Sequence, residues 1–375
     1  MSCAERGLQL RIESTTSFGN HTNLERAVIT ETDDYFCHQT VAPHAYVAVN
    51  DPSWADRGYH TVSDPDRFGI DIGVSMYPNA DRIETYAIAA VPGKQWSLRA
   101  TRDLSEGRYP MWAGPIRVEI LEPLKRWRYS CEPNESGISF ELEYEARNKP
   151  YQIDQPSVRK GGRLIHHDVY VFQPGYYTGV VNLDGQSFEL DRAAGQRDRT
   201  WGLRAAGEGQ LPSGVLAWLD AEFDDVSILA HIRDRADEVP QVRGGAIYHD
   251  NGPVVPVVEF EHDLKFDFET RQCEGGSIRL VDADGEEWIV EIEPALRIYL
   301  SGAGYTSTKT RRGRLPVPMW HERWDLTDPD LVARVEGLND NASHMRCNGR
   351  TGHGVLETSI GAHSRYKVSD PVEWA

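Results

Sequence analysis

The chain has 375 residues, with 40 Lys and Arg against 58 Asp and Glu, so its net charge is 40 − 58 = −18 at neutral pH. A polyanion of this kind neither gathers nucleic-acid phosphates nor settles on an anionic membrane surface. Its apolar and aromatic content is that of a globular protein and is too high for a disordered chain. At roughly 150 residues per domain, the length predicts two or three domains or one large β architecture.

Neither a membrane span nor a secretory signal is expected. The best apolar run, residues 86–91, is far shorter than the roughly 18 residues of a spanning helix, and charges interrupt the N-terminal segment. We therefore expect a cytoplasmic protein. The cysteines are odd in number and include no CxxC pair, which predicts neither a disulfide framework nor a zinc ribbon: Cys3, Cys37, Cys131, Cys273 and Cys347.

Short alternating segments separated by turn residues occupy most of the chain. Residues 116–121 and 138–146 alternate apolar and charged side chains, which predicts strands with one hydrated face. Asp184-Gly185, between residues 177–183 and 186–190, predicts a hairpin with a type I′ turn. Asn251-Gly252 and Asp284-Gly285 mark two further hairpins of the same plan. Helix is expected only at residues 121–126 and 328–336.

This pattern, with 33 Gly and 21 Pro between the segments, predicts an all-β protein of antiparallel sandwiches or barrels with minor helix. The hairpins are divided between the two halves of the chain. We therefore expect two β domains in tandem, residues 1–192 and 193–375, each with an interior wide enough for side chains or one small ligand.

The densest group of charged side chains is the string RDRTWGLR at residues 197–204. In a strand, Arg197, Arg199 and Trp201 share one face, whereas Asp198 lies on the other. A guanidinium can stack on the tryptophan and pair with the aspartate. These residues fit either a buried plug that closes the end of a barrel or a binding site, and both interpretations stay open at this point.

The same string resembles the RDRSWG-type motif of two-domain, lipocalin-like (calycin) proteins. That group is similar to the carotenoid 1,2-hydratases (hydroxyneurosporene synthases), the tocopherol cyclases and the lipocalin-like Diels-Alderases. Residues 114–124, 138–147 and 352–366 support the resemblance, which extends from His38-Gln39 to Tyr366. It implies two lipocalin-like β domains, contact between Trp201 and Arg365, and chemistry on apolar molecules.

Acid-catalysed chemistry on an alkene needs a carboxylic acid in an apolar cavity and aromatic faces that stabilise a cation. Asp198 is one candidate, although the three adjacent arginines should lower its pKa and keep it ionised. Glu357 interrupts an apolar strand, and Asp220 alternates with Trp218 on one sheet face. Each is either a functional carboxyl or one that is paired or faces water.

Two histidines and several aromatic residues complete the candidate site. His38 and His167 are candidate general bases or hydrogen-bond donors, with a structural role as the alternative. No HxH or HExxH pattern occurs, so no metal is expected, and the absence of a P-loop or GxGxxG motif predicts catalysis without a cofactor. The candidate substrate-binding residues are Trp201, Trp218, Arg199, Tyr170 and Trp320.

The sequence therefore predicts a cofactor-independent enzyme acting on an apolar terpenoid, polyene or polycyclic substrate. The reaction would be acid-base hydration, dehydration, isomerisation or cyclisation in a barrel or interdomain cavity. A non-catalytic carrier of such molecules is the first alternative, and a scaffold with filled barrels is the second. The expected partner is a hydrophobic small molecule, and exposed hairpin edges would allow a homodimer.

Overall fold

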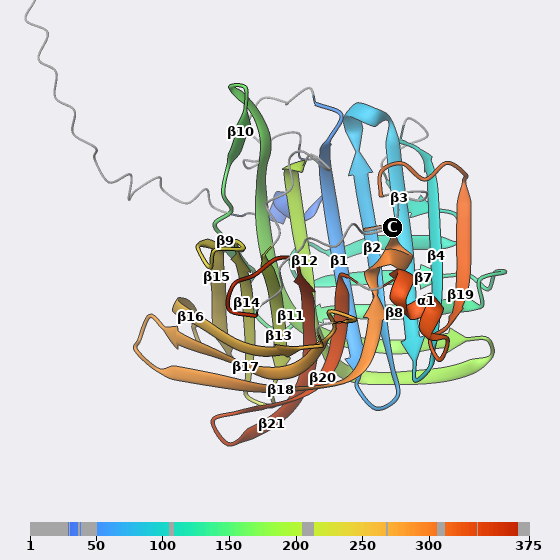
Figure 1. The fold of residues 1–375 in the computed structure, drawn as a ribbon. Coiled ribbons are helices and arrows are strands. Elements are labelled where there is room, and N and C mark those ends of the chain that lie inside the picture. Colours follow the sequence, from blue (N-terminus) through green and yellow to red (C-terminus); the bar gives the residue numbers. More distant parts are fainter. Residues whose placement is uncertain are drawn as a thin grey trace, which may run out of the picture.

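The computed structural model describes residues 29, 31–36, 38, 51–104, 109–204, 214–267, 269–305, 312–335 and 337–366. The described chain forms two β units, an open curled sheet and a closed barrel, with little helix (Figure 1). The predicted all-β class is therefore confirmed. Gln39, at which the family resemblance begins together with His38, lies outside the described residues, as do Cys3 and Cys37. Cys131, Cys273 and Cys347 are buried free thiols.

The first unit is a 13-stranded sheet within the described part of the chain. Its main order is β19 (Met319–Asp325), β4 (Lys94–Asp103), β3 (Arg82–Val91), β2 (Phe68–Tyr77), β1 (Trp54–Asp64), β12 (Gln186–Arg204), β11 (Arg163–Leu183), β8 (Ile138–Ala146), β7 (Arg126–Cys131), β6 (Ile116–Glu122) and β5 (Met111–Ala113). Two short strands, β9 (Tyr151–Ile153) and β10 (Val158–Lys160), pair with β11.

The second unit is a closed antiparallel barrel. Its strands follow the order β13 (Val215–Glu222), β14 (Val226–Asp234), β15 (Pro240–His249), β16 (Val254–Phe266), β17 (Cys273–Asp282), β18 (Glu287–Tyr299), β20 (Asn339–Cys347) and β21 (Arg350–Ile360). β19 comes from this part of the sequence but lies beside β4 at the edge of the first sheet (Figure 1). The division at residue 192 stays a prediction, and β12 runs through that position in the first sheet.

The burial pattern of the strands explains why the two units pack together. β8 alternates as predicted, with Ile138, Phe140 and Leu142 in the core and the charged residues between them outside. β2 differs, because all of its residues are buried. Its apolar residues face the core of the first sheet, and Asp71 lies on the opposite side, which the barrel covers. A polar strand face has thus become an internal interface.

Most of the predicted turns are confirmed. Asp184 and Gly185 join β11 to β12 with φ of 48° and 87°, the left-handed pair of a type I′ turn. Asn251 lies in the β15–β16 hairpin with φ of 53°. The β17–β18 hairpin also forms, but its turn is longer, because the carboxylate of Asp282 accepts hydrogen bonds from two backbone N–H groups of the loop.

One of the two predicted helices is wrong. The helix expected at residues 328–336 is present as α1 (Pro329–Val335). Residues 121–126 instead form the turn between β6 and β7, where Leu124 has a left-handed φ of 62° and donates its N–H to Asp34. A helix cannot accommodate that conformation. The remaining helical turns are 3-10 helices: η1 (Glu31–Asp34), η2 (Pro78–Ala80) and η4 (Leu300–Ala303).

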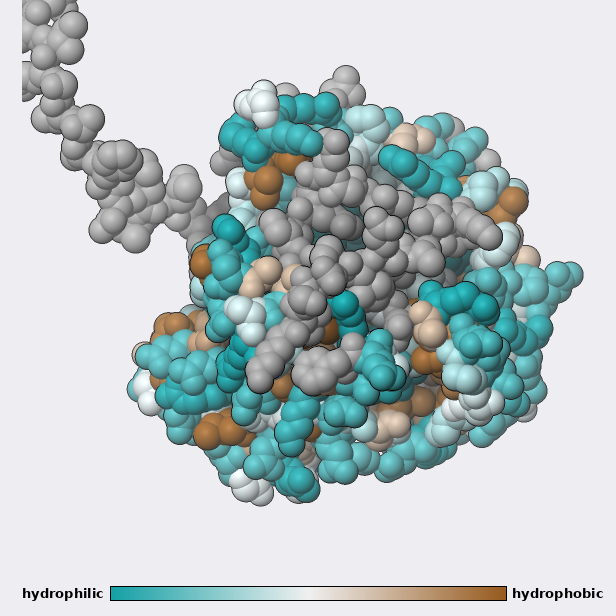
Figure 2. All heavy atoms as spheres, viewed as in Figure 1, coloured by the Kyte–Doolittle hydropathy of each residue, from teal (hydrophilic) through white to brown (hydrophobic). Residues whose placement is uncertain are grey.

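Apolar side chains are buried within each of the two units and between them. On the face drawn in Figure 2, hydrophilic residues dominate and hydrophobic residues lie singly or in small groups. None of the described helices has the length and hydropathy to cross a membrane.

Arg147 connects the two units. It follows β8, and its guanidinium reaches the β13–β14 turn, where it donates to Glu222, to Ser227 (each 2.9 Å) and to the carbonyl oxygens of residues 223 and 224. Its Nε donates to Asp250. Every N–H of the guanidinium therefore has an acceptor, although the side chain is only 3% exposed.

Replacing Arg147 with methionine should lower the free energy of unfolding by about 3 kcal/mol, because it leaves the Glu222 carboxylate buried without its cation. Chemical denaturation measures this change. Arg192→Met is the matched control: Arg192 is 57% exposed, and its ion pair with Glu145 lies at the surface, so its loss should have little effect. Equal effects of the two substitutions would contradict the role given to Arg147.

Candidate functional site

β12 lies between β1 and β11, and its two faces belong to different environments. Arg197, Arg199 and Trp201 point into the interior of the first sheet, as the alternation predicted. Asp198 lies on the opposite face and contacts Tyr170 of β11. The string RDRTWGLR therefore contributes to two separate groups of residues.

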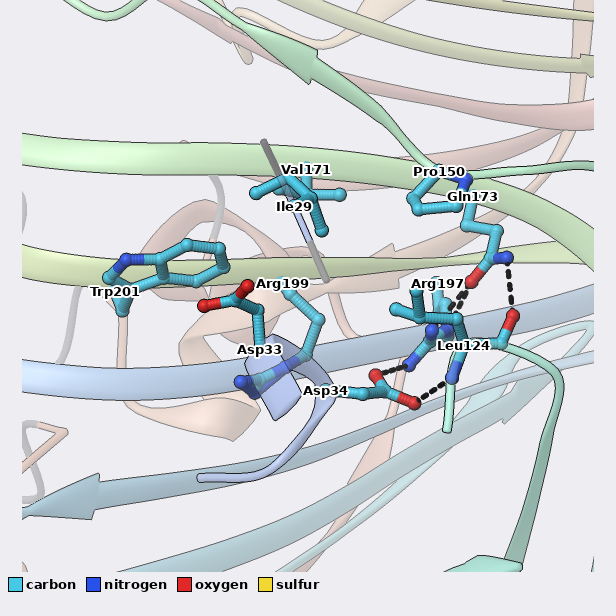
Figure 3. Close-up of a pocket in the computed structure, with 10 residues that line it drawn as sticks. All are labelled: Ile29, Asp33, Asp34, Leu124, Pro150, Val171, Gln173, Arg197, Arg199 and Trp201. Atoms are coloured by element: carbon cyan, nitrogen blue, oxygen red, sulfur yellow. Dashed lines mark hydrogen bonds and ion pairs between the residues drawn. The ribbon is translucent and has the colours of Figure 1, made fainter. Parts of the chain in front are cut away.

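The inner face is a filled polar core, shown in Figure 3. Arg197 donates to Asp34 (2.7 Å) and Gln173 (2.8 Å), and its guanidinium lies 4.7 Å from the Trp127 ring centroid. Arg199 donates to Asp56 (2.8 Å). The cavity beside these residues measures about 10 Å³, which is space for about one water molecule. This geometry fits the plug interpretation for Arg197, Arg199 and Trp201.

His38 belongs to the same core. Its ring nitrogens lie 2.8 Å from Asp33 Oδ1 and 3.2 Å from Asp56 Oδ2, and the ring stacks on Trp201 with centroids 4.1 Å apart. Burial lowers the pKa of His38, but its hydrogen bonds to Asp33 and Asp56 outweigh that effect and raise it above the ordinary value. His38 is thus held as a partner of two carboxylates within this core.

The contact between Trp201 and Arg365 implied by the resemblance is not formed. Trp201 is buried in the first sheet against His38. Arg365 follows the last barrel strand and pairs with Asp263 (3.3 Å). The two residues belong to different β units, so the pairing of one barrel's first and last strands does not apply to them.

Asp198 faces the interface between the sheet and the barrel. Its Oδ2 accepts a hydrogen bond from the Tyr170 hydroxyl (2.6 Å), and the side chain is buried. Burial raises its pKa to about 6, against the opposite influence of Tyr170, Arg204 and Arg312. The expectation of a lowered pKa is wrong in its net direction: Arg204 and Arg199 do act to lower the pKa of Asp198, but burial outweighs them.

Two further carboxyls meet across the interface at one tyrosine. The Tyr59 hydroxyl of β1 lies 3.1 Å from Asp71 Oδ1 of β2 and also bonds to Asp340 Oδ2 of β20. A hydroxyl donates only one hydrogen, so at least one of these carboxyls must be protonated to donate in return. Burial raises the pKa of Asp71 to about 6, and burial beside Asp71 and Glu357 raises that of Asp340 well above its ordinary value.

Glu357 of β21 completes this group. It lies opposite Trp218 of β13 and Asp340 of β20 in the barrel register. Burial, with the nearby charges of Asp198 and Asp71, raises the pKa of Glu357 to about 8, although Arg233 acts in the opposite direction. We call Asp71, Asp198, Asp340 and Glu357 the carboxyl cluster.

Aromatic rings line the same interface. Trp218 meets Tyr59 and Phe172 edge to face, with centroids 6.0 Å and 5.5 Å apart, and Phe172 contacts Tyr170 at 5.1 Å. Tyr86 covers Gly73, where a Cβ would lie 1.9 Å from the ring, so a larger residue could not occupy this position. The carboxyl cluster therefore lies against ring faces and edges that can stabilise a developing positive charge.

The arrangement supplies an acid and a base side by side. At neutral pH Glu357, with a pKa of about 8, keeps its proton, whereas Asp198, with a pKa of about 6, is mostly ionised. Carboxyls whose environments hold them in different protonation states are the usual components of general acid-base catalysis. Among the described residues, no three His, Cys, Asp or Glu side chains come together to form a possible metal site.

The structure gathers only some of the residues predicted for the site. Asp198, Tyr170, Glu357 and Trp218 come together at the interface, whereas His38, Arg199 and Trp201 lie in the filled core. Asp220 faces the interface, but it lies beside Glu222, which Arg147 binds, and burial next to Glu222 raises the pKa of Asp220 well above its ordinary value.

Two more predicted residues lie apart from the carboxyl cluster. His167 is partly exposed, and its Nδ1 lies 2.7 Å from the Ser157 hydroxyl. Burial lowers its pKa. Trp320 lies on β19, opposite Arg99 of β4. In the sheet order, β4, β3, β2 and β1 separate β19 from β12.

Sequence reasoning missed Asp71, Asp340 and Tyr59. A signal for Asp71 was present, because it interrupts the apolar run Phe68-Gly-Ile-Asp-Ile just as Glu357 interrupts its own strand. Asp340 follows an asparagine at the start of β20, where no alternation marks it. Its role emerges only when the barrel packs against the first sheet.

Comparisons with known proteins give a family and a fold. The sequence pattern of a family of unknown function, DUF8625, matches residues 29–368. The chain belongs to this family. A comparison with curated proteins finds no match.

Among solved structures, the chain resembles an AttH-like protein from Nitrosomonas europaea, with a TM-score of 0.54 at 14% identity over 85% of this chain and 98% of the other. It also resembles CghA solved with Sch210972, with a TM-score of 0.52 at 12% identity over 87% and 97%. Kievitone hydratase from Nectria haematococca gives 0.41 at 14% identity over 87% and 98%. The first two similarities show the fold and confirm the two-domain, lipocalin-like architecture.

Replacing Asp198 with asparagine should stabilise the protein at high pH. Burial raises the pKa of Asp198 from 3.8 to about 6, so the wild-type fold loses stability as pH rises through this range, and the loss is complete above it. The asparagine side chain would keep an acceptor for Tyr170 but carry no charge. We expect about 1–3 kcal/mol of added stability at pH 8 and none at pH 3.5, measured by chemical denaturation. Destabilisation at pH 8 would show that the arginines hold an ionised Asp198.

Proposed function

We propose that this protein is an enzyme that uses the carboxyl cluster for acid-base chemistry on an alkene-bearing apolar substrate, without a cofactor. The observation that supports this function best is the position of Glu357 and Asp198. The first is a partly buried carboxyl with a pKa raised to about 8, the second is buried and mostly ionised, and both lie beside aromatic residues of the interface. Such a site offers a proton donor and a proton acceptor at the same pH.

The proposed reaction begins with Glu357. Its carboxyl donates a proton to one alkene carbon, and the positive charge that develops on the other carbon lies against Tyr170 and Trp218. Asp198 then accepts a proton from water as the water oxygen bonds to the cationic carbon, which completes hydration. The reverse sequence is dehydration.

The same groups account for the related reactions. If Asp198 removes a proton from the carbon next to the cationic centre, the double bond moves and the substrate is isomerised. If a second double bond of the substrate attacks the cation, a ring closes. Apolar walls suit terpenoid, polyene or polycyclic molecules, which we propose as the substrate class. We also propose a cytoplasmic location, with which the buried free thiols of the described residues agree.

The function can be tested without knowing the substrate. The purified protein is incubated with a lipid extract of its source organism in D₂O and, separately, in H₂¹⁸O, and the products are resolved by mass spectrometry. Wild-type protein should add or remove one water, or introduce deuterium at carbon, in an apolar compound. Glu357→Gln and Asp198→Asn should each slow this conversion by at least about a hundredfold.

Two exposed carboxyls on β16 provide matched controls. Glu259→Gln and Asp263→Asn make the same chemical changes at side chains that are 62% and 80% exposed, and both should keep wild-type rates. Folded wild-type protein that binds an apolar compound but converts none would favour a carrier. Full activity of both Glu357→Gln and Asp198→Asn would overturn the proposed roles.

A further inference from the structure

Beside the carboxyl cluster, the outer face of β14 presents Arg233 and His231 to the first sheet. These two alternate with Ala230 and Ile232, which belong to the barrel core, so their side chains leave the barrel on the same side. The side chain of Arg233 forms neither a hydrogen bond nor an ion pair with any other described residue. Burial, followed by the charge of Arg204, lowers the pKa of Arg233.

His231 is a second polar group without a partner. It is only 5% exposed, and neither ring nitrogen has a hydrogen-bond partner among the described residues. Burial, reinforced by Arg233 and Arg204, holds its pKa well below the ordinary value, so the ring is neutral and keeps one N–H to donate. A buried polar group without a partner costs free energy, so His231, next to the partly exposed Arg233, indicates that a ligand supplies the missing acceptor.

Arg204, at the end of β12, reaches the same place from the first sheet. Its guanidinium lies 5.7 Å from the Tyr170 ring centroid, and the His231 ring lies 5.3 Å from the same ring. Arg204 pairs with Asp168 through Nε and Nη2, each at 3.0 Å, and remains 34% exposed. Burial raises the pKa of Asp168, but Arg204 outweighs this and lowers it to about 2, so Asp168 stays ionised.

The two arginines differ in their compensation. Asp168 pairs with Arg204, and the charge of Asp198 also acts on Arg204, whereas Arg233 has no ion-pair partner among the described residues. A chain with a net charge of −18 thus keeps a cationic, partly exposed group next to an aromatic wall. Because Arg233 is partly removed from water and has no paired carboxylate, the simplest compensation is an anion on the ligand.

We propose that Arg204, Arg233 and His231 bind a planar monoanion, a carboxylate or an equally acidic enolate, carried by the apolar substrate of the proposed enzyme. A single charge fits better than a phosphate, because the ionised Asp198 lies near Arg204 and would repel a second one. Guanidinium groups bind such planar anions through paired hydrogen bonds. Leu216 of β13 lies opposite Arg233 of β14. Together with Tyr170, it provides an apolar surface for the rest of the ligand.

The test compares two probes of the same shape, naphthoate and naphthamide, by titration calorimetry on the full chain at pH 8. The carboxylate should bind about tenfold to a hundredfold more tightly than the uncharged amide. Arg233→Gln should reduce this preference to about twofold or less. It should not lower the melting temperature, because it removes a buried charge that has no partner.

Arg279→Gln is the control, since Arg279 is a barrel arginine that pairs with exposed glutamates on the outer surface. It should leave the preference unchanged. Equal binding of the two probes, no binding of naphthoate, or an unchanged preference in Arg233→Gln would overturn the anion site. The inference takes its ligand from the proposed function, but the outcomes separate. A preference for naphthoate without turnover overturns the enzyme alone, and equal binding with intact turnover overturns the anion site alone.

Discussion

The structure depends on burying a polar sheet face. The face of the first sheet that carries Asp71, Asp198 and Tyr170 would be hydrated in a single-layer sheet, but the barrel covers it and removes it from water. Carboxyls enclosed in this way either pair with cations or take up protons. Here the nearby arginines compensate only part of the charge, so the pKa values of Glu357 and Asp340 are raised, and that of Glu357 reaches about 8. The acid-base chemistry proposed for the site follows from this burial.

Charged and polar residues of the same types have different roles on the two sides of β12. On the inner face, Arg197, Arg199 and His38 are matched with Asp34, Asp56 and Asp33, and the remaining cavity has room for about one water. That group is a charged plug in which each of these cations has a carboxylate partner. On the outer face, His231 and Arg233 lack partners among the described residues, and the carboxyls hold unusual protonation states. Groups that are complete are structural, and groups that are incomplete are the ones that require a ligand.

The sequence predicted what local patterns determine. Alternation identified strands such as β8, and Asp184-Gly185 identified a tight turn, because both depend on neighbours along the chain. The separation of Asp198 from Arg197 and Trp201 also followed from the period of a strand. Only Asp198, Glu357, Tyr170 and Trp218 of the predicted site residues meet in one place.

The remaining features depend on contacts between distant segments. Tyr59 and Asp340 are 281 residues apart, and they meet only because β20 of the barrel lies against β1. The pKa of Asp198 was predicted in the wrong direction, since counting adjacent arginines ignores both the face that each occupies and the burial that dominates. β19 returning to the edge of the first sheet is likewise a tertiary pairing with no local signal.

The central claim is that the barrel holds a carboxyl of the interface in its protonated form at neutral pH. The direct measurement is a ¹³C NMR titration of protein labelled at the glutamate side-chain carboxyls, with the Glu357 resonance assigned by its loss in Glu357→Gln. The account predicts a midpoint of about 8 for Glu357. A midpoint near the ordinary glutamate value of 4.5 would show that the carboxyl cluster is solvated and ionised, and would contradict the account.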